Sequence, residues 1–240
     1  SGEQTYGDAV TLGADTTLTG STVRFNGSVS GAHDLSISGA GVFGDAAGDT
    51  VSLTGSDKHL TVSGTTTINA GSLSTSGSQT YTGAVTLGSD TTLTGSALSF
   101  NSTVDGGQTL TLNSSGTTTF NDAVGGTTAL SSLTTNAGGT TALNGGSVET
   151  SGEQTYGDAV TLGADTTLSG SALRFNSTVD GGQALTLNSS GATTFEDAVG
   201  GTTALTRLTT DADGTTVLNG GSVETSGEQT YGDAVTLGAD

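Results

Sequence analysis

A 75-residue repeat is the feature of this sequence that most constrains its fold. The segment Ser-Gly-Glu-Gln-Thr-Tyr-Gly-Asp-Ala-Val-Thr-Leu-Gly-Ala-Asp begins at Ser1, Ser151 and Ser226, and a close variant begins at Ser76. The second and third full repeats are identical at 61 of 75 positions when aligned without gaps. Repeats of this regularity stack on one another instead of forming separate globular domains. We expect one continuous segment of a longer chain, 1–240, with units 1–75, 76–150 and 151–225 and a partial unit 226–240.

A shorter period lies inside the long one. Within each repeat the aromatic residues are 18 to 20 positions apart, as in Tyr81, Phe100 and Phe120. The wider gaps between one aromatic group and the next fit two such steps if a smaller residue fills the missing position. The predicted column has 13 members at a mean spacing of 225/12, or 18.75 positions: Tyr6, Phe25, Phe43, Val62, Tyr81, Phe100, Phe120, Ala137, Tyr156, Phe175, Phe195, Ala212 and Tyr231.

The local pattern indicates short strands. Leu98-Ser99-Phe100 and Leu110-Thr111-Leu112 alternate apolar and polar residues, which is typical of a strand with one buried face. Gly, Asn, Asp and Ser bound these runs and favour turns, and no stretch carries the apolar spacing of a helix. The sequence therefore predicts an all-β, single-stranded parallel β-solenoid. It should have about 13 coils of roughly 19 residues, four coils for each 75-residue repeat.

Residues one coil apart should lie directly over one another. The aromatic column then becomes a buried stack of rings, with neighbours about 4.8 Å apart along the axis. Asn101 and Asn121 directly follow Phe100 and Phe120, so we expect their amides to form a short hydrogen-bonded ladder.

Composition excludes several classes of function. The chain has no Cys, so it holds no disulfide, thiolate metal site or cysteine nucleophile. Its 23 Asp and Glu against 4 Lys and Arg give a formal charge of −19, which disfavours nucleic acid as a partner. No apolar run approaches the roughly 18 residues of a membrane span, so we expect no membrane insertion in this segment.

Three phrases carry a resemblance to a known family. They are TYGDAVTLGADTTLTGS, RFNSTVDGGQALTLNSSGATTF and DAVGGTTAL followed by LTT. They resemble the β-strand repeats of filamentous-haemagglutinin-like exoproteins and autotransporter-type bacterial surface adhesins, over the whole of 1–240. The resemblance implies a right-handed β-helix that forms the shaft of a large secreted protein on the bacterial cell surface. Its implied partners are adjacent repeats of the same chain and a host-cell or neighbouring-cell surface.

Acidic residues are the first candidates for chemistry. Asp8, Asp158 and Asp233 are equivalent in the long repeat, but the second repeat has Gly83 at this position. This variation favours solvated surface charge. Calcium binding by turn carboxylates is the alternative, and the turn at Glu196 and Asp197 is its best location. The nonapeptide of calcium-binding β-rolls is missing.

The sequence offers no catalytic, cofactor-binding or metal-binding residue. His33 and His59 have no repeat equivalents and are predicted to lie on the surface. No nucleophile elbow places a serine for attack, and a polysaccharide lyase would need more basic residues than the four present. Arg24 and Arg174 lie between inward residues and should point outward. We expect a structural protein and not an enzyme.

Two alternatives remain open from the sequence. Runs of Thr, such as Thr117-Thr118-Thr119, could form a repetitive face that binds glycan, ice or calcium, although Thr109 and Thr117 are replaced by Ala184 and Ala192 in the next repeat. The ends of a stacked segment expose unpaired main-chain groups, so self-association into fibres is a further possibility.

Overall fold

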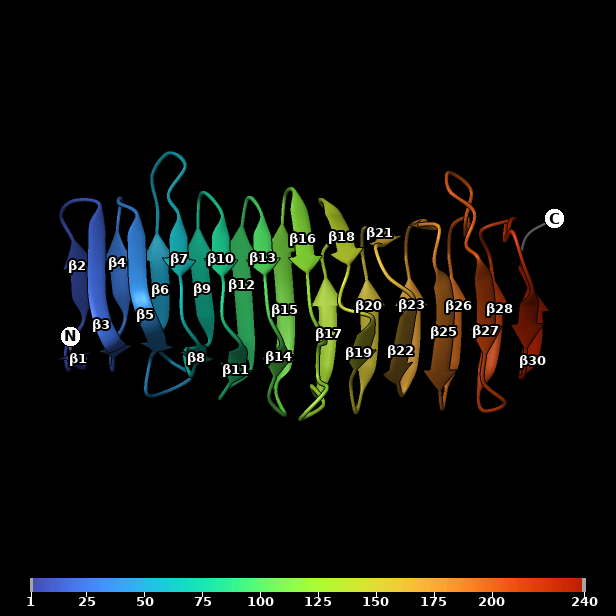
Figure 1. Ribbon diagram of the computed structural model, residues 1–240, viewed down its shortest axis with the longest axis horizontal. Coiled ribbons are helices and arrows are strands. Elements are labelled where there is room, and N and C mark those ends of the chain that lie inside the picture. Colours follow the sequence, from blue (N-terminus) through green and yellow to red (C-terminus); the bar gives the residue numbers. More distant parts are fainter. Residues whose placement is uncertain (1, 239–240) are drawn as a thin grey trace.

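The computed structural model, which describes residues 2–238, is an elongated β-solenoid (Figure 1). Every described element is a β-strand, and every strand pair is parallel. The strands lie side by side along the long axis, and the two ends of the chain are at opposite ends of the rod. The predicted all-β parallel solenoid is therefore confirmed. The right-handed winding stays a prediction from the resemblance.

Three ladders of stacked strands form the three sides of the rod. The first consists of β1 (Gln4–Tyr6), β3 (Thr16–Phe25), β5 (Leu35–Phe43), β8 (Thr66–Ile68), β11 (Val85–Leu87), β14 (Val104–Asp105), an isolated bridge at Val124, β19 (Ser147–Glu149), β22 (Thr166–Gly170), β25 (Ala184–Ser189), β27 (Arg207–Thr210) and β29 (Gln229–Tyr231). The second consists of the first halves of β3 and β5, β7 (Leu60–Val62), β10 (Gln79–Tyr81), β13 (Leu98–Phe100), β16 (Thr117–Phe120), β18 (Thr140–Leu143), β21 (Ala159–Leu162), β24 (Val179–Asp180) and bridges at Val199 and Val223. The third consists of β2 (Val10–Leu12), β4 (Val29–Gly31), β6 (Thr50–Leu53), β9 (Ser72–Thr75), β12 (Thr91–Gly95), β15 (Thr109–Ser114), β17 (Ser132–Thr135), β20 (Glu153–Tyr156), β23 (Ala172–Phe175), β26 (Ala192–Phe195), β28 (Thr215–Leu218) and β30 (Ala234–Leu237).

The chain visits the ladders in a fixed order. It passes from the first to the third, then to the second, and returns to the first one level higher. The long strands β3 and β5 turn the corner from the second ladder to the first, which joins these two ladders near the N-terminal end. The third ladder has twelve strands, so the rod has twelve turns and is about 58 Å long at 4.8 Å a turn.

The core is a narrow column of packed apolar side chains that the three ladders enclose. Leu, Val, Ile, Phe and Tyr side chains point inward at alternate strand positions, and most are less than 3% exposed. Turns at the corners allow the change of direction. Gly125, for example, has a φ of 73°, and a Cβ there would collide with the main-chain oxygen of Glu149. A thin core suffices because each coil is covered by its neighbours on both sides.

The three aromatic groups stack as predicted. Ring centroids are 5.4 Å apart for Tyr81 and Phe100 and 5.1 Å apart for Phe100 and Phe120. The equivalent groups in the other two repeats have centroid distances between 4.8 and 5.8 Å and interplanar angles of 16° or less. All of these pairs lie in register on neighbouring strands, so the predicted one-coil spacing is confirmed within each group.

The prediction was wrong for most of the smaller residues that were assigned to the aromatic column. Val62 lies beneath Tyr81, but the register partner of Phe43 is Ile68. Ala137 and Ala212 are exposed turn residues and belong to no column. Leu143 is the register partner that follows Phe120, because longer turns enlarge the coils that lack an aromatic residue.

The number of turns in each long repeat is also corrected. The strands β1 and β29 carry the same Gln-Thr-Tyr sequence three long repeats apart, and eleven register steps of the first ladder separate them. Three repeats therefore take eleven turns, and one repeat takes three and two-thirds turns instead of four. Tyr6 lies on the first ladder, Tyr81 on the second, Tyr156 on the third and Tyr231 on the first again. Equivalent positions of the long repeat thus face three directions in succession.

Candidate functional site

A buried glutamine precedes each internal tyrosine by two positions on the same strand. Gln79 and Gln154 are both fully buried. Gln154 Nε2 donates to the main-chain oxygens of Val148, at 3.2 Å, and Ser169, at 2.8 Å, and its Oε1 accepts from the Tyr156 hydroxyl at 2.9 Å. Burial raises the pKa of the Tyr156 phenol far above its ordinary value of 10.0. This side chain therefore joins two sides of the coil from within, a role that the sequence analysis did not predict.

The glutamine position was visible in the strand pattern. Gln154 is two residues before Tyr156 on the same strand, so both side chains lie on the inward side. Gln79 makes the equivalent three bonds, to Leu73, Thr94 and Tyr81.

Asp158 is buried, which corrects the prediction of solvated surface charge at this position. The residue is 3% exposed, and its Oδ1 accepts hydrogen bonds from Thr135 Oγ1 at 3.0 Å and from Thr141 Oγ1 at 2.7 Å. Its Oδ2 is buried without a partner, and burial raises the pKa of this carboxyl. Asp158 lies in the bend between β20 and β21, where the chain passes from the third ladder to the second, and its side chain is buried there.

The equivalents of Asp158 have different surroundings. Asp8 lies on the first coil and is exposed, whereas Asp233 accepts bonds from Thr210 and Thr216. Where Gly83 replaces the aspartate, the hydroxyl of Thr66 is buried without a partner. The pair of Thr hydroxyls and Asp is therefore an internal structural device that occurs twice, at Asp158 and at Asp233.

The amide ladder is confirmed and is longer than predicted. Asn121 Nδ2 donates to Asn101 Oδ1 at 2.9 Å, and Asn144 Nδ2 donates to Asn121 Oδ1 at 2.8 Å. In the third repeat Glu196 takes the place of Asn121.

The proposed calcium turn is occupied by protein groups. Glu196 forms an ion pair with Arg174, and its Oε2 accepts from Asn219 Nδ2 at 2.7 Å. Asp197 Oδ1 accepts from the main-chain N–H of Ala198. No cluster of three or more His, Cys, Asp or Glu side chains suited to a metal ion occurs among residues 2–238.

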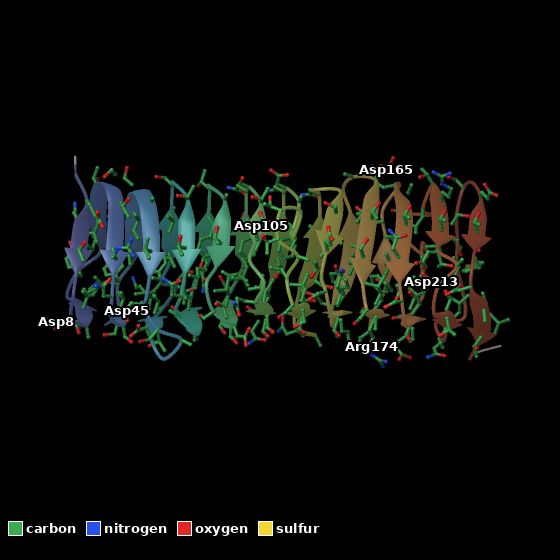
Figure 2. The ribbon with its side chains drawn as sticks, turned by 90° about the horizontal axis from the view of Figure 1, so that it is seen from below. Asp8, Asp45, Asp105, Asp165, Arg174 and Asp213 are labelled. Atoms are coloured by element: carbon green, nitrogen blue, oxygen red, sulfur yellow. The ribbon has the colours of Figure 1, made fainter. Side chains whose placement is uncertain are left out.

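Aspartates at the corners bind the main chain of the next coil. Asp15 accepts from the N–H of Asp34 at 3.0 Å, and Asp165 accepts from the N–H of Ala184 at 2.9 Å. The Asp34 N–H is the main reason why the pKa of Asp15 is lowered from its ordinary value of 3.8. Figure 2 shows acidic side chains, such as Asp105 and Asp213, distributed along the rod. Much of the negative charge thus has a local role at the coil corners.

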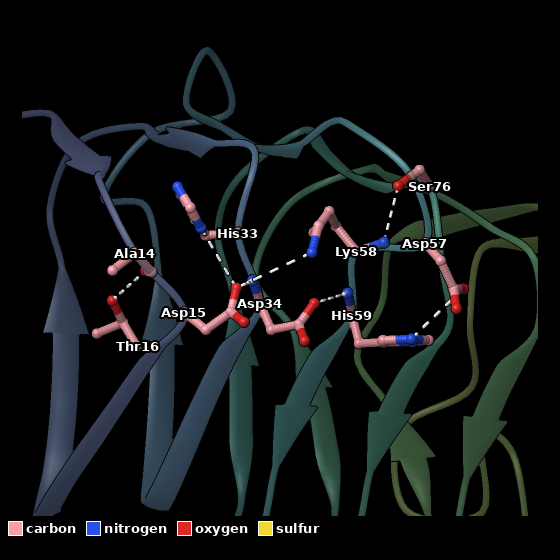
Figure 3. A network of polar contacts seen from close by, with 9 residues as sticks. All are labelled: Ala14, Asp15, Thr16, His33, Asp34, Asp57, Lys58, His59 and Ser76. Atoms are coloured by element: carbon pink, nitrogen blue, oxygen red, sulfur yellow. Dashed lines mark hydrogen bonds and ion pairs between the residues drawn. The ribbon is translucent and has the colours of Figure 1, made fainter.

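The two histidines belong to a polar network on the first repeat (Figure 3). His33 Nδ1 lies 3.3 Å from Asp15 Oδ1, which is also 4.0 Å from Lys58 Nζ. Both imidazoles are about one-third exposed, which confirms the surface position predicted for them. Arg24 and Arg174 also point outward, as predicted.

His59 is the residue that most resembles part of a hydrolytic triad. Its Nδ1 lies 2.9 Å from Ser78 Oγ, and its Nε2 lies 3.4 Å from Asp57 Oδ1. However, the main-chain N–H of Ser78 also donates to Nδ1, at 3.0 Å. The imidazole therefore accepts from the backbone of the next coil and fixes a corner, as the aspartates do.

The comparisons do not supply a family. No family model, curated protein or solved structure matches this chain. Residues 2–238 contain no helix that is long and apolar enough to cross a bilayer.

Proposed function

We propose that this chain is a segment of the structural shaft of a large bacterial extracellular filament or adhesin, without catalytic activity. One observation carries the proposal: three parallel ladders run without interruption between opposite ends of the rod. The length of the rod therefore grows in proportion to the length of the chain, by about 53 Å for every eleven turns. The resemblance of the repeats to those of surface adhesins supports the extracellular location.

The surface charge suits this role. A formal charge of −19 keeps rods apart and soluble, and the aspartates that bear it also bind corner N–H groups. The shaft would hold a binding tip away from the producing cell, so that the tip can contact the surface of a host cell or a neighbouring cell.

A length series tests the mechanical role. Chains with one, two and three copies of 1–225 should give scattering profiles of single rods that lengthen by about 53 Å for each copy. Rods that fold back or fail to lengthen would contradict the proposal. Protease treatment of intact producing cells tests the location, because a surface shaft must be cleaved while cytoplasmic marker proteins remain intact.

A repetitive binding face is the second candidate. The register aligns outward hydroxyls from five consecutive coils of the third ladder, namely Ser72, Thr92, Thr111, Thr134 and Thr155. These positions are not equivalent in the long repeat, so the replacement of Thr109 by Ala184 does not interrupt this row. Co-sedimentation with insoluble glycans and an ice-recrystallisation assay test this candidate. Melting temperatures with and without a calcium chelator test the calcium alternative.

A further inference from the structure

Five asparagines begin the tripeptide Asn-x-Ser or Asn-x-Thr, which is the acceptor motif for N-linked sugars. They are Asn26, Asn101, Asn113, Asn176 and Asn188. Asn26, Asn101 and Asn176 are equivalent in the 75-residue repeat. Each of the three keeps the motif, although the two following residues are Gly-Ser in the first repeat and Ser-Thr in the other two. The structure separates these three tripeptides from the remaining pair.

The three equivalent tripeptides lie at corners of the rod. Each begins directly after a strand that ends in phenylalanine, namely β3, β13 and β23, and its three residues lie outside the strands. Asn101 and Asn176 are exposed, Asn26 is half-buried, and none of the three middle residues is buried. A modifying enzyme can reach such segments, because they run over the surface as other loops do.

The remaining two tripeptides belong to the wall of the core. Asn113 and Asn188 lie within β15 and β25, and the residues that follow them, Ser114 and Ser189, are buried. To bind either tripeptide, an enzyme would have to pull a buried residue out of the core. These two asparagines therefore carry the same motif in a position that the fold protects.

The hydrogen bonds of the side-chain amides show the same division. Among residues 2–238, the amide nitrogens of Asn26, Asn101 and Asn176 donate no hydrogen bond. The Oδ1 atom of Asn101 accepts from Asn121 Nδ2, and that of Asn176 accepts from Arg174 Nε. By contrast, four of the five asparagines without the motif donate from Nδ2 to the preceding coil, namely Asn69, Asn121, Asn144 and Asn219. The amide nitrogens that hold coils together are thus mainly on residues without the motif.

We propose that Asn26, Asn101 and Asn176 are acceptor sites for N-linked sugars and that Asn113 and Asn188 are not. The three corner sites combine the motif, a surface position outside the strands and an amide nitrogen that makes no bond within the rod. The two strand sites have the motif alone.

The reaction needs a sugar that is activated by a diphosphate group, which a nucleotide or a lipid carries. The asparagine Nδ2 attacks the anomeric carbon of this sugar. A carbon–nitrogen bond forms as the bond from the anomeric carbon to the diphosphate oxygen breaks, the diphosphate leaves with the bonding electron pair, and Nδ2 loses one proton. The modified amide keeps its carbonyl oxygen, so Asn101 Oδ1 still accepts the bond from Asn121.

The corner sites would place sugars on all three sides of the rod. They follow the first-ladder part of β3, the second-ladder strand β13 and the third-ladder strand β23. Successive sites are three and two-thirds turns apart, which separates them by about 18 Å along the axis and a third of a turn around it. Bulky, hydrated groups in this arrangement would keep neighbouring rods apart whichever sides they turn to one another.

Glycopeptide mass spectrometry of the protein from the cells that produce it tests the proposal. We expect sugar on Asn26, Asn101 and Asn176 and none on Asn113 or Asn188. A single sugar at each corner site would support a nucleotide-linked donor, and a uniform oligosaccharide would support a lipid-linked donor. Unmodified asparagine at all three corners, or equal occupancy of the corner and strand sites, would overturn the proposal.

Substitutions near Asn101 separate the motif from the asparagine itself. Thr103→Ala removes the hydroxyl of the motif and should abolish the sugar on Asn101. Ser102→Ala is the matched control and should leave the occupancy unchanged, because the motif does not specify its middle residue. Asn176 is the reference site in both variants, and sugar retained on Asn101 in Thr103→Ala would contradict the assignment.

Circular dichroism checks that each variant folds, and Thr103→Val replaces Thr103→Ala if that variant does not fold. Absence of sugar from every site would reject the acceptor sites and leave the proposed shaft intact, because the length series measures a different property.

Discussion

The buried glutamine Gln154 allows a sharp test of how the coil is held together. Replacement by Leu removes two hydrogen bonds to main-chain oxygens and leaves the Tyr156 hydroxyl buried without its partner. Each lost bond costs about 0.5–1.5 kcal/mol net, and an orphaned buried hydroxyl costs about 1–3 kcal/mol. The apolar leucine offsets part of this loss, so we expect Gln154→Leu to lower the free energy of unfolding by about 2–4 kcal/mol.

The chain supplies its own control. Gln229 occupies the same Gln-Thr-Tyr sequence in the last coil, where its bonds to the Val223 oxygen and the Tyr231 hydroxyl are exposed to water, which can replace either partner. Gln229→Leu should therefore change the free energy of unfolding by less than about 0.5 kcal/mol. Urea denaturation followed by circular dichroism measures both values.

A second substitution distinguishes the hydrogen bond from general packing. In Gln154→Leu/Tyr156→Phe the orphaned hydroxyl is gone, so about 1–3 kcal/mol should be recovered relative to Gln154→Leu alone. Equal losses at Gln154 and Gln229, or no recovery in the double variant, would refute the reasoning.

Three further predictions concern the core, the interior carboxylate and the corners. Phe175→Ala should cost about 3–5 kcal/mol in urea unfolding because the ring is 1% exposed between two other rings, whereas Arg174→Ala should cost less than about 1 kcal/mol; similar losses would contradict an inward Phe175. Because the pKa of Asp158 is raised on folding, its contribution to stability is greatest below pH 3.8 and is lost as pH rises through the folded pKa. The stability of the wild type relative to Asp158→Asn should therefore increase as pH is lowered from 7 to 3, and a pH-independent difference would contradict the burial. Asp165→Ala should speed hydrogen exchange of the Ala184 amide, since it removes the acceptor of that N–H; an unchanged rate would mean that the bond does not protect it.

The sequence predicted the parts of the fold that depend on local alternation. The large aromatic side chains of Tyr81, Phe100 and Phe120 make the inward positions easy to recognise in the sequence. Short strands and tight turns keep each of these residues one coil from the next. The amide ladder at Asn101 and Asn121 followed from the same register.

The number of turns could not be counted in this way. Coils without an aromatic residue contain longer turns, and extra Gly, Asn and Asp residues at corners leave the alternation of the strands unchanged. The coil that follows Phe120 is therefore longer than its predecessor and reaches its register partner only at Leu143, and the next Tyr emerges on another ladder. Ala137 fitted the average spacing but lies in such a turn.

The interior polar residues were missed for a different reason. Strand alternation on β20 places Gln154 inward together with Tyr156, and Asp158 is buried in the bend that follows this strand. Their polarity argued for the surface, and Gly83 in the second repeat strengthened that interpretation for the aspartate. Buried polar groups are tolerated here because neighbouring strands bring carbonyls and Thr hydroxyls to meet them.

Paired cysteines test most directly whether a long repeat takes three and two-thirds turns. The chain has no native Cys, so introduced pairs are unambiguous. Thr119 and Ala142 are outward register partners on β16 and β18, whereas four turns per repeat would place Thr119 beside Asn136. With a short thiol cross-linker, Thr119→Cys/Ala142→Cys should give an intramolecular link in the folded chain, and Thr119→Cys/Asn136→Cys should not. Efficient linkage of the second pair and none of the first would contradict the account.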